Sequence, residues 1–150
     1  MYHGVRVRAT SVGGETVPFP PEFPRNTMGW PVVPECVYHG LMALTREYRP
    51  TSILISETGC AFPDKMDARG QVHDPERVAF LQSYLEQAFR GQKEGVPLDG
   101  IFIWSLLDNF EWERGFTQRF GLVYVDYPTQ RRIPKSSARW FRDYRGDPHG

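Results

Sequence analysis

The chain has 150 residues, of which 40% are hydrophobic and 14% aromatic, and its 18 Lys and Arg residues balance its 18 Asp and Glu residues. This composition is typical of a globular protein, and no apolar run approaches the roughly 20 residues that cross a bilayer. The balanced charge provides no field that would attract nucleic acid or an anionic membrane, so neither is an expected partner. The equal numbers of acidic and basic residues are therefore compatible with an uncharged ligand.

The first residues lack the basic region, apolar core and cleavage site of a secretory signal, so we expect a cytoplasmic protein. Cys36 and Cys60 are the only cysteines, and we expect both to be reduced thiols. Neither has the neighbours that a zinc site needs, so we predict no metal. We assign no role to the histidines, which stand apart from carboxylate and cysteine ligands in the sequence: His3, His39, His73 and His149.

Residues 10–34 hold six prolines and several glycines, which predicts a long, irregular, proline-rich loop. A helix is predicted over residues 35–49, with Pro34 at its start. Its apolar positions follow helical spacing and should cover one face of a sheet: Val37, Leu41, Leu44 and Tyr48.

The short apolar run 53–56 predicts a parallel strand buried on both sides, which ends at the carboxylate of Glu57. After a loop over residues 58–73, Asp74 and Pro75 provide an N-cap and a first-turn proline for a second helix, which ends within residues 91–97. The inner face of this helix is predicted to carry Val78, Leu81, Leu85 and Ala88.

A second strand is predicted over residues 101–104, followed by a loop that Asp108 and Asn109 are expected to cap. A β-branched segment, 122–125, comes next. A last helix is predicted to start near Pro134 and to present Ala138, Phe141 and Tyr144 inward. The order helix, strand, helix, strand, excursion and helix predicts an α/β fold built from βα units.

Both predicted strands lead into side chains that suit carbohydrate chemistry. Glu57 follows the first strand, whereas Trp104, Glu111 and Trp112 follow the second. In (β/α) barrels, catalytic groups lie at the carboxyl ends of the strands. Glycoside hydrolysis uses two carboxyl groups, so Glu57 and Glu111 could form that pair. The alternative is a solvated loop glutamate beside a tryptophan that packs in the core.

Longer motifs resemble a known family. WSLLDNFEW (104–112), RFGLVYVDY (119–127) and TQRRIPKSSARW (129–140) resemble the C-terminal part of glycoside hydrolase family 1, the β-glucosidases, and ISETG (55–59) is similar to its I-T-E-N-G signature. The resemblance implies the C-terminal part of a (β/α)8 TIM barrel, about the last two to three βα units. Because a complete barrel needs about 250 residues, residues 1–150 would form a single partial domain.

The resemblance also implies a role for particular residues. Glu57 matches the family's nucleophile in a retaining double displacement, whereas Glu111 matches a ligand for sugar hydroxyls. Trp104 matches the indole platform beneath the sugar ring, and Trp112 would donate its indole N–H to a neighbouring hydroxyl. The expected substrate is a β-glucoside or a related small saccharide, and the family implies no cofactor.

Two further aromatic residues belong to the implied pocket. Phe120 would form one wall of the pocket. Tyr2 would be the last residue of an N-Y-Y motif, whose second tyrosine contacts the nucleophile. Near the nucleophile the chain departs from the family pattern, because Ser56 stands in place of Thr and Thr58 in place of Asn. The exchange at Thr58 replaces an amide beside Glu57 with a hydroxyl.

The family's acid/base glutamate lies in a T-x-N-E-P motif, and this chain contains no Asn-Glu-Pro. We therefore expect the isolated chain to be inactive, although its family is one of O-glycosyl hydrolases. Two alternatives to a catalytic chain remain: a non-catalytic remnant, or a weak sugar-binding fragment that needs an N-terminal half of the barrel. The preference for the aglycone, and for gluco, galacto or fuco substrates, is left open.

Overall fold

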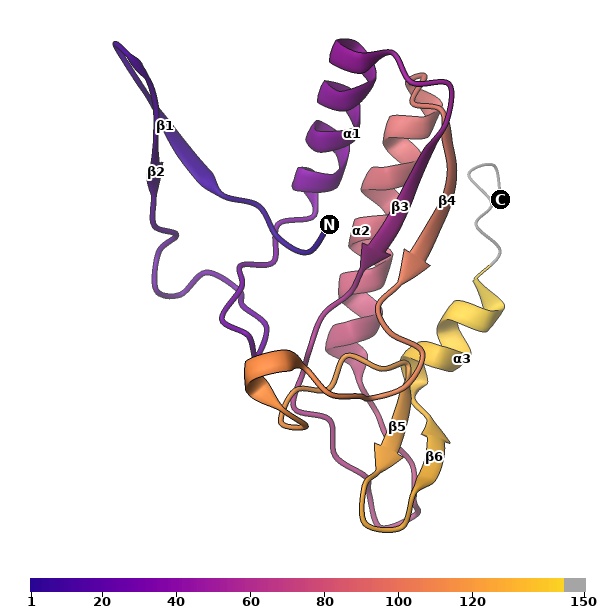
Figure 1. Ribbon diagram of the computed structural model, residues 1–150. Coiled ribbons are helices and arrows are strands. Elements are labelled where there is room, and N and C mark those ends of the chain that lie inside the picture. The colour runs from indigo at the N-terminus through magenta and orange to yellow at the C-terminus, as the bar shows by residue number, and fades with distance from the viewer. Residues whose placement is uncertain (145–150) are drawn as a thin grey trace.

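The computed structural model describes residues 1–144, which contain three two-stranded sheets, three α-helices and one short 3₁₀ helix (Figure 1). Its central layer is a parallel pair of strands, β3 (Ile53–Thr58) and β4 (Leu98–Ile103), joined through helix α2 (Pro75–Lys93). Within residues 1–144, no helix is both long enough and apolar enough to span a membrane. The parallel pair with its connecting helix confirms the α/β prediction.

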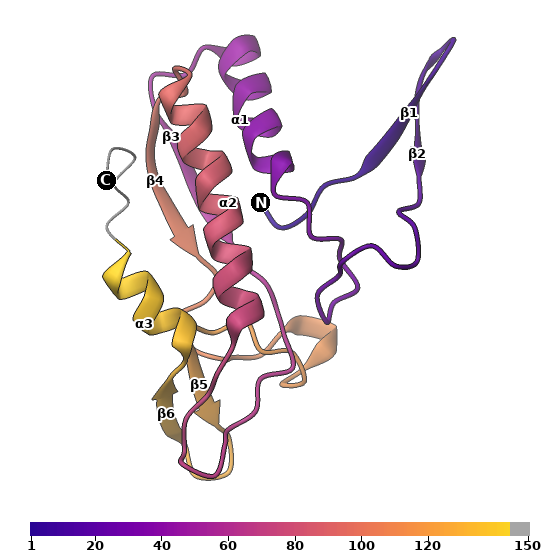
Figure 2. The same cartoon turned by 180° about the vertical axis from the view of Figure 1, so that it is seen from behind.

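Helices α1 (Glu35–Tyr48) and α2 cover the same face of the β3–β4 sheet, as Figure 2 shows from behind. The core lies between these helices and the sheet, and its buried members include Val37, Leu41, Ile55, Phe80, Leu81, Tyr84 and Leu98. The inward stripe predicted for α1 is therefore correct for Val37 and Leu41. It is wrong for Leu44 and Tyr48, which are 43% and 71% exposed, because α2 covers only the first half of the stripe.

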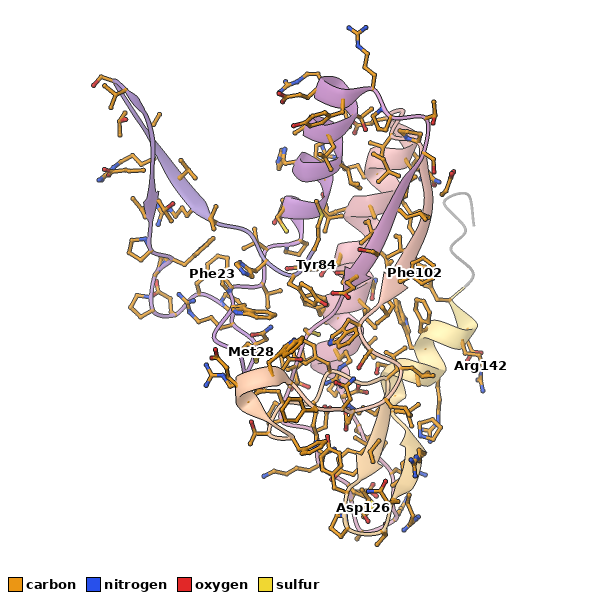
Figure 3. The ribbon with its side chains drawn as sticks, viewed as in Figure 1. Phe23, Met28, Tyr84, Phe102, Asp126 and Arg142 are labelled. Carbon is orange, nitrogen blue, oxygen red and sulfur yellow. The ribbon has the colours of Figure 1, made fainter. Side chains whose placement is uncertain are left out.

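The opposite face of the β3–β4 sheet is open. Leu54 is 58% exposed and Phe102, labelled in Figure 3, is 60% exposed. The prediction that the first strand is buried on both sides is therefore wrong for the described residues, because helices cover one face only. The strand is also longer than predicted, since it runs to Thr58, which pairs with Ile103 of β4 after a shift in register.

The segment predicted as a loop over residues 10–34 contains part of a β-hairpin. Strand β1 (Arg6–Thr10) pairs antiparallel with β2 (Gly13–Val17), and the hairpin projects away from the helices (Figure 1). Its ladder is possible because the prolines begin only at Pro18, so that every residue of β2 keeps its N–H. The irregular segment therefore begins after β2.

A second hairpin corrects the predicted start of the last helix. Strand β5 (Val123–Asp126) pairs antiparallel with β6 (Arg131–Pro134), and helix α3 (Ser136–Asp143) begins only after it. Pro134 thus ends a strand and does not open a helix. Its fixed φ suits either place, which is why the sequence pattern was ambiguous.

A cluster of buried charged side chains joins the loops that follow β3 and β4. Three aspartates and three basic side chains form a connected set of ion pairs: Asp64, Asp74, Asp108, Arg77, Arg119 and Lys135. All are nearly or fully inaccessible to solvent except the Arg119 side chain, which is 17% exposed. Because positive and negative side chains are equal in number, the cluster carries no formal net charge.

Arg77 anchors one side of this cluster to α2. Its Nη1 and Nη2 donate to the two carboxylate oxygens of Asp64 at 3.0 and 2.7 Å, and Nη1 also lies 2.5 Å from Asp74 Oδ2. Asp74 stands at the N-cap position of α2, as predicted, but its side chain makes no capping hydrogen bond. It accepts instead from the backbone N–H and hydroxyl of Ser137, which ties the start of α3 to the start of α2.

Lys135 anchors the other side, where its ammonium bridges two loops. Its Nζ lies 2.5 Å from Asp64 Oδ2, in the loop after β3, and 2.8 Å from Asp108 Oδ1, in the loop after β4. Burial lowers the pKa of Lys135, and the charge of Arg77 lowers it further, against the opposing effect of Asp108 and Asp64. The two carboxylates therefore compensate an ammonium that burial alone would disfavour.

Lys135→Met should lower the free energy of unfolding by about 3–5 kcal/mol, because three buried carboxylates then face only Arg77 and Arg119, which leaves one buried negative charge without compensation. Lys65→Met is the matched control, since Lys65 lies on the surface of one of the bridged loops, and it should change stability by less than about 0.5 kcal/mol. Urea denaturation followed by circular dichroism measures both. Equal stability of the two variants would contradict the importance of the bridge.

Candidate active site

The carboxyl ends of β3 and β4 lie side by side. The backbone N–H of Trp104 donates to Thr58 O at 2.8 Å, so the residues that follow each strand enter the same region. A Cβ at Gly59 would lie 2.0 Å from the carbonyl oxygen of Trp104, so a side chain at this position would clash with backbone. The glycine after the glutamate and threonine is therefore what lets the two strand ends approach.

Glu57 projects from β3 and is exposed, and Tyr2 lies against it. The Tyr2 hydroxyl donates to Glu57 Oε2 at 2.8 Å across 55 positions of sequence, while the Met1 amino group donates to the Glu57 carbonyl oxygen. Burial raises the pKa of Tyr2 far above its usual value, and the hydrogen bond and charge of Glu57 raise it further. The expected contact between this tyrosine and Glu57 is thus present in the geometry.

An aromatic wall surrounds this contact. The Tyr2 ring lies 5.6 Å from Trp30 and 6.4 Å from Phe120, and Trp30 lies 6.1 Å from Phe120 between ring centroids. Phe120 is only 3% exposed. Sequence reasoning missed Trp30, although a tryptophan between Gly29 and Pro31 in a proline-rich segment is a signal for a fixed aromatic in a loop.

The remaining candidate site residues lie in the excursion, which is the loop over residues 104–122 between β4 and β5. Its two ends are joined by hydrogen bonds from Ser105 N to Phe120 O at 3.3 Å and from Leu122 N to Ser105 O at 2.9 Å. The peptide bond between Trp104 and Ser105 is cis. Trp104 is half-buried and directly precedes the first of these joined ends.

Glu111 and Trp112 lie at the short 3₁₀ helix η1 (Trp112–Arg114) within this excursion. Glu111 is half-buried, and its charge contributes to the raised pKa of Tyr2, so both carboxylates act on one phenol. The Trp112 side chain is 81% exposed. The structure therefore brings Glu57, Glu111, Tyr2 and Phe120 into one neighbourhood and leaves the Trp112 indole open to solvent.

Asp108 and Asn109 both bond to the excursion, as predicted. Asn109 Nδ2 donates to Ser105 Oγ at 3.0 Å and to Leu107 O at 3.1 Å. Asp108 does more than cap the loop, since it accepts from the backbone N–H groups of Gly121 and Val125 and belongs to the buried ion cluster. The buried ion cluster therefore helps to fix the conformation of the excursion.

The histidines and cysteines of the described residues, 1–144, add no further site. His73 Nε2 lies 3.5 Å from Asp67 Oδ2, so the expectation that it stands apart from carboxylates is wrong, because the loop over residues 58–73 folds back on itself. Residues 1–144 contain no group of three His, Cys, Asp or Glu side chains placed to hold a metal, and His149 lies outside that range. Both cysteines are free thiols, and burial raises the pKa of Cys60.

Comparison with known proteins gives a consistent result. The model of glycosyl hydrolase family 1 matches residues 5–146. A 1,4-beta-D-glucan glucohydrolase of Thermotoga neapolitana is 49% identical over 118 residues, and beta-glucosidase A of Thermotoga maritima is 48% identical over 120 residues. These matches cover 79% and 80% of this chain but 27% of each relative, so the chain spans about a quarter of their length.

A solved structure extends the likeness to three dimensions. The family 1 β-glucosidase of Thermotoga maritima in complex with isofagomine lactam superimposes with a TM-score of 0.85 at 44% identity. The match covers 93% of this chain and 32% of that structure. The described α/β arrangement is thus similar to one part of a family 1 β-glucosidase.

Thr58→Val should raise the free energy of unfolding by about 1 kcal/mol. Thr58 is 3% exposed and its hydroxyl finds no hydrogen-bond partner within residues 1–144, so the native state carries the cost of desolvating a polar group without compensation. Thermal and urea denaturation measure the change. A loss of stability of similar size would show that the hydroxyl has a partner in solution.

Proposed function

The chain belongs to glycosyl hydrolase family 1, and on that premise we propose that it carries the nucleophile side of a retaining β-glucosidase active site. Glu57 is the nucleophile. The observation that carries this proposal is the hydrogen bond from the Tyr2 hydroxyl to Glu57 Oε2 at the end of a parallel strand. The contact orients one carboxylate oxygen and leaves the other for a substrate.

The reaction proceeds in two displacements. The Glu57 carboxylate attacks the anomeric carbon, a glycosyl ester forms, and the bond to the aglycone oxygen breaks as a carboxylic acid protonates that oxygen. Water, deprotonated by the same acid/base group, then hydrolyses the ester with retention. The two carboxyl groups stand about 5–5.5 Å apart in such enzymes. With no Asn-Glu-Pro in these 150 residues, the acid/base group comes from another part of the barrel.

The other site residues bind the sugar. Glu111 accepts hydrogen bonds from sugar hydroxyls with charge-assisted strength. Trp104 stacks beneath the ring, Phe120 walls the pocket, and the exposed Trp112 indole donates to a hydroxyl of the same sugar. The substrate is a β-glucoside or a related small saccharide.

The open sheet face supports the barrel assignment. Leu54 and Phe102 face solvent here, whereas in a closed barrel they would pack against strands of the other βα units. The chain therefore represents about the last two to three βα units of a (β/α)8 barrel, a single partial domain that needs an N-terminal half. We propose that the assembled enzyme acts in the cytoplasm.

A non-catalytic or weakly sugar-binding fragment is the second candidate. The lack of an Asn-Glu-Pro motif favours it, together with the open apolar face and the unpaired edges of β3 and β4, which favour association with other chains. The two candidates differ in whether these residues hydrolyse a glycoside without the acid/base group.

The isolated 150-residue chain should not hydrolyse an aryl β-glucoside above the buffer blank. Loss of a general acid alone typically reduces the rate by about 10²–10⁴-fold, and an incomplete pocket reduces it further. A chromogenic assay at high protein concentration measures the rate. Turnover that disappears in Glu57→Gln would contradict the need for another part of the barrel.

A graft of this chain in place of the matching segment of the Thermotoga maritima beta-glucosidase A should restore turnover. In the graft, Glu57→Gln should lower kcat by at least about 10³-fold and abolish trapping by a 2-fluoro sugar, because no ester can form. Glu111→Gln should raise KM and lower kcat/KM but still trap the ester. Glu113→Gln, an exposed neighbour on η1, is the control. Equal trapping in Glu57→Gln and Glu113→Gln would overturn the assignment of the nucleophile.

A further inference from the structure

One buried hydroxyl joins the helix layer to the site. Tyr84 belongs to α2 (Figure 3), is 1% exposed, and stacks on Phe80 with 3.8 Å between ring centroids. Its hydroxyl donates to the carbonyl oxygen of Tyr2 at 3.1 Å and accepts from the backbone N–H of Val33, also at 3.1 Å. The hydroxyl therefore connects two segments that are far apart in sequence.

Each of these segments carries part of the aromatic wall around Glu57. The first holds Tyr2, whose own phenol bonds to Glu57 Oε2. The second leads from Trp30, which packs on Tyr2, to Val33 at the start of α1. Residues 1–5 belong to no helix or strand, so their backbone has no ladder to fix it. A contact from a well-packed helix supplies that constraint.

We propose that Tyr84 is a positioning residue that holds the Tyr2 and Trp30 segments together, so that the Tyr2 phenol stays on the Glu57 carboxylate. Its significance for catalysis rests on the proposed function of Glu57, whereas the positioning itself is a property of this chain. The arrangement needs a neutral Tyr84, because a phenolate cannot donate to the Tyr2 carbonyl. Burial raises the pKa of Tyr84 and keeps it neutral across the working range of pH.

Tyr84→Phe removes this hydroxyl and preserves the ring that stacks on Phe80. The segment then keeps the bond from the Met1 amino group to the Glu57 carbonyl but loses its contact with α2, and the phenol moves toward solvent and away from Glu57. Because burial and Glu57 both raise the pKa of Tyr2, its acid dissociation constant should increase at least tenfold. A purely structural role for Tyr84 would lower stability and leave the Tyr2 phenol unchanged.

The test follows the Tyr2 phenol by NMR in the full 150-residue chain labelled with ¹³Cζ-tyrosine, with Tyr2→Phe to assign the resonance. Tyr127→Phe is the matched control, because the buried Tyr127 hydroxyl has no hydrogen-bond partner within residues 1–144. The unmodified chain and the control should keep Tyr2 protonated at about pH 11. Tyr84→Phe should ionise it at least tenfold more readily, and an unchanged Tyr2 titration in a folded Tyr84→Phe chain would overturn the proposal.

A second measurement decides the matter if Tyr84→Phe does not fold. Hydrogen exchange of the Val33 amide in the unmodified chain should be slowed at least a hundredfold relative to an unprotected amide, whereas exchange at the unprotected rate would overturn the proposal. Neither readout depends on hydrolysis. An inactive graft with a Tyr2 phenol that responds to Tyr84 would therefore count against the proposed function and support the positioning role.

Discussion

Lys135 has no exposed side-chain surface, yet its ammonium joins the loop after β3 to the loop after β4 through Asp64 and Asp108. Arg77 extends the same network to the start of α2, and Asp74 continues it to the start of α3. Backbone hydrogen bonds also fix these loops, among them those from Asp108 N to Val123 O and from Lys135 N to Leu122 O. The buried ion pairs add side-chain links between the loops, and their strength depends on complete compensation of charge in a medium of low dielectric constant.

The candidate site is supported both by this network of buried ion pairs and by Tyr84. Asp108 supports the excursion that carries Trp104 and Glu111, while Tyr84 holds the segment that places Tyr2 on Glu57. Glu57 thus lies on a strand, whereas Tyr2, Trp104 and Glu111 lie on irregular backbone supported by rigid elements, an arrangement common in enzymes. The family match and the open sheet face are consistent with the proposal that these elements belong to a larger barrel.

Much of the fold followed from local patterns. Val37 and Leu41 occupy the predicted inward positions of α1, and ISETG and WSLLDNFEW lie at the ends of neighbouring strands. The errors have physical causes: Leu44 and Tyr48 follow helical spacing but meet no partner, and Pro134 suits a strand end as well as a helix start. The pattern of residues 10–17 contained no proline to exclude a strand, and part of this segment pairs in the first hairpin.

By itself, the sequence determined the family and the order of the helices and the two parallel strands, because these are properties of motif and period along the chain, whereas neither hairpin was predicted. Only the tertiary structure decided that Trp30 joins the aromatic wall, that Asp64, Asp108 and Lys135 form one buried cluster, and that the Tyr84 hydroxyl reaches Tyr2. These contacts join residues as far as 82 positions apart. Their partners are chosen by the packing of helices against the sheet, which no local pattern of residues encodes.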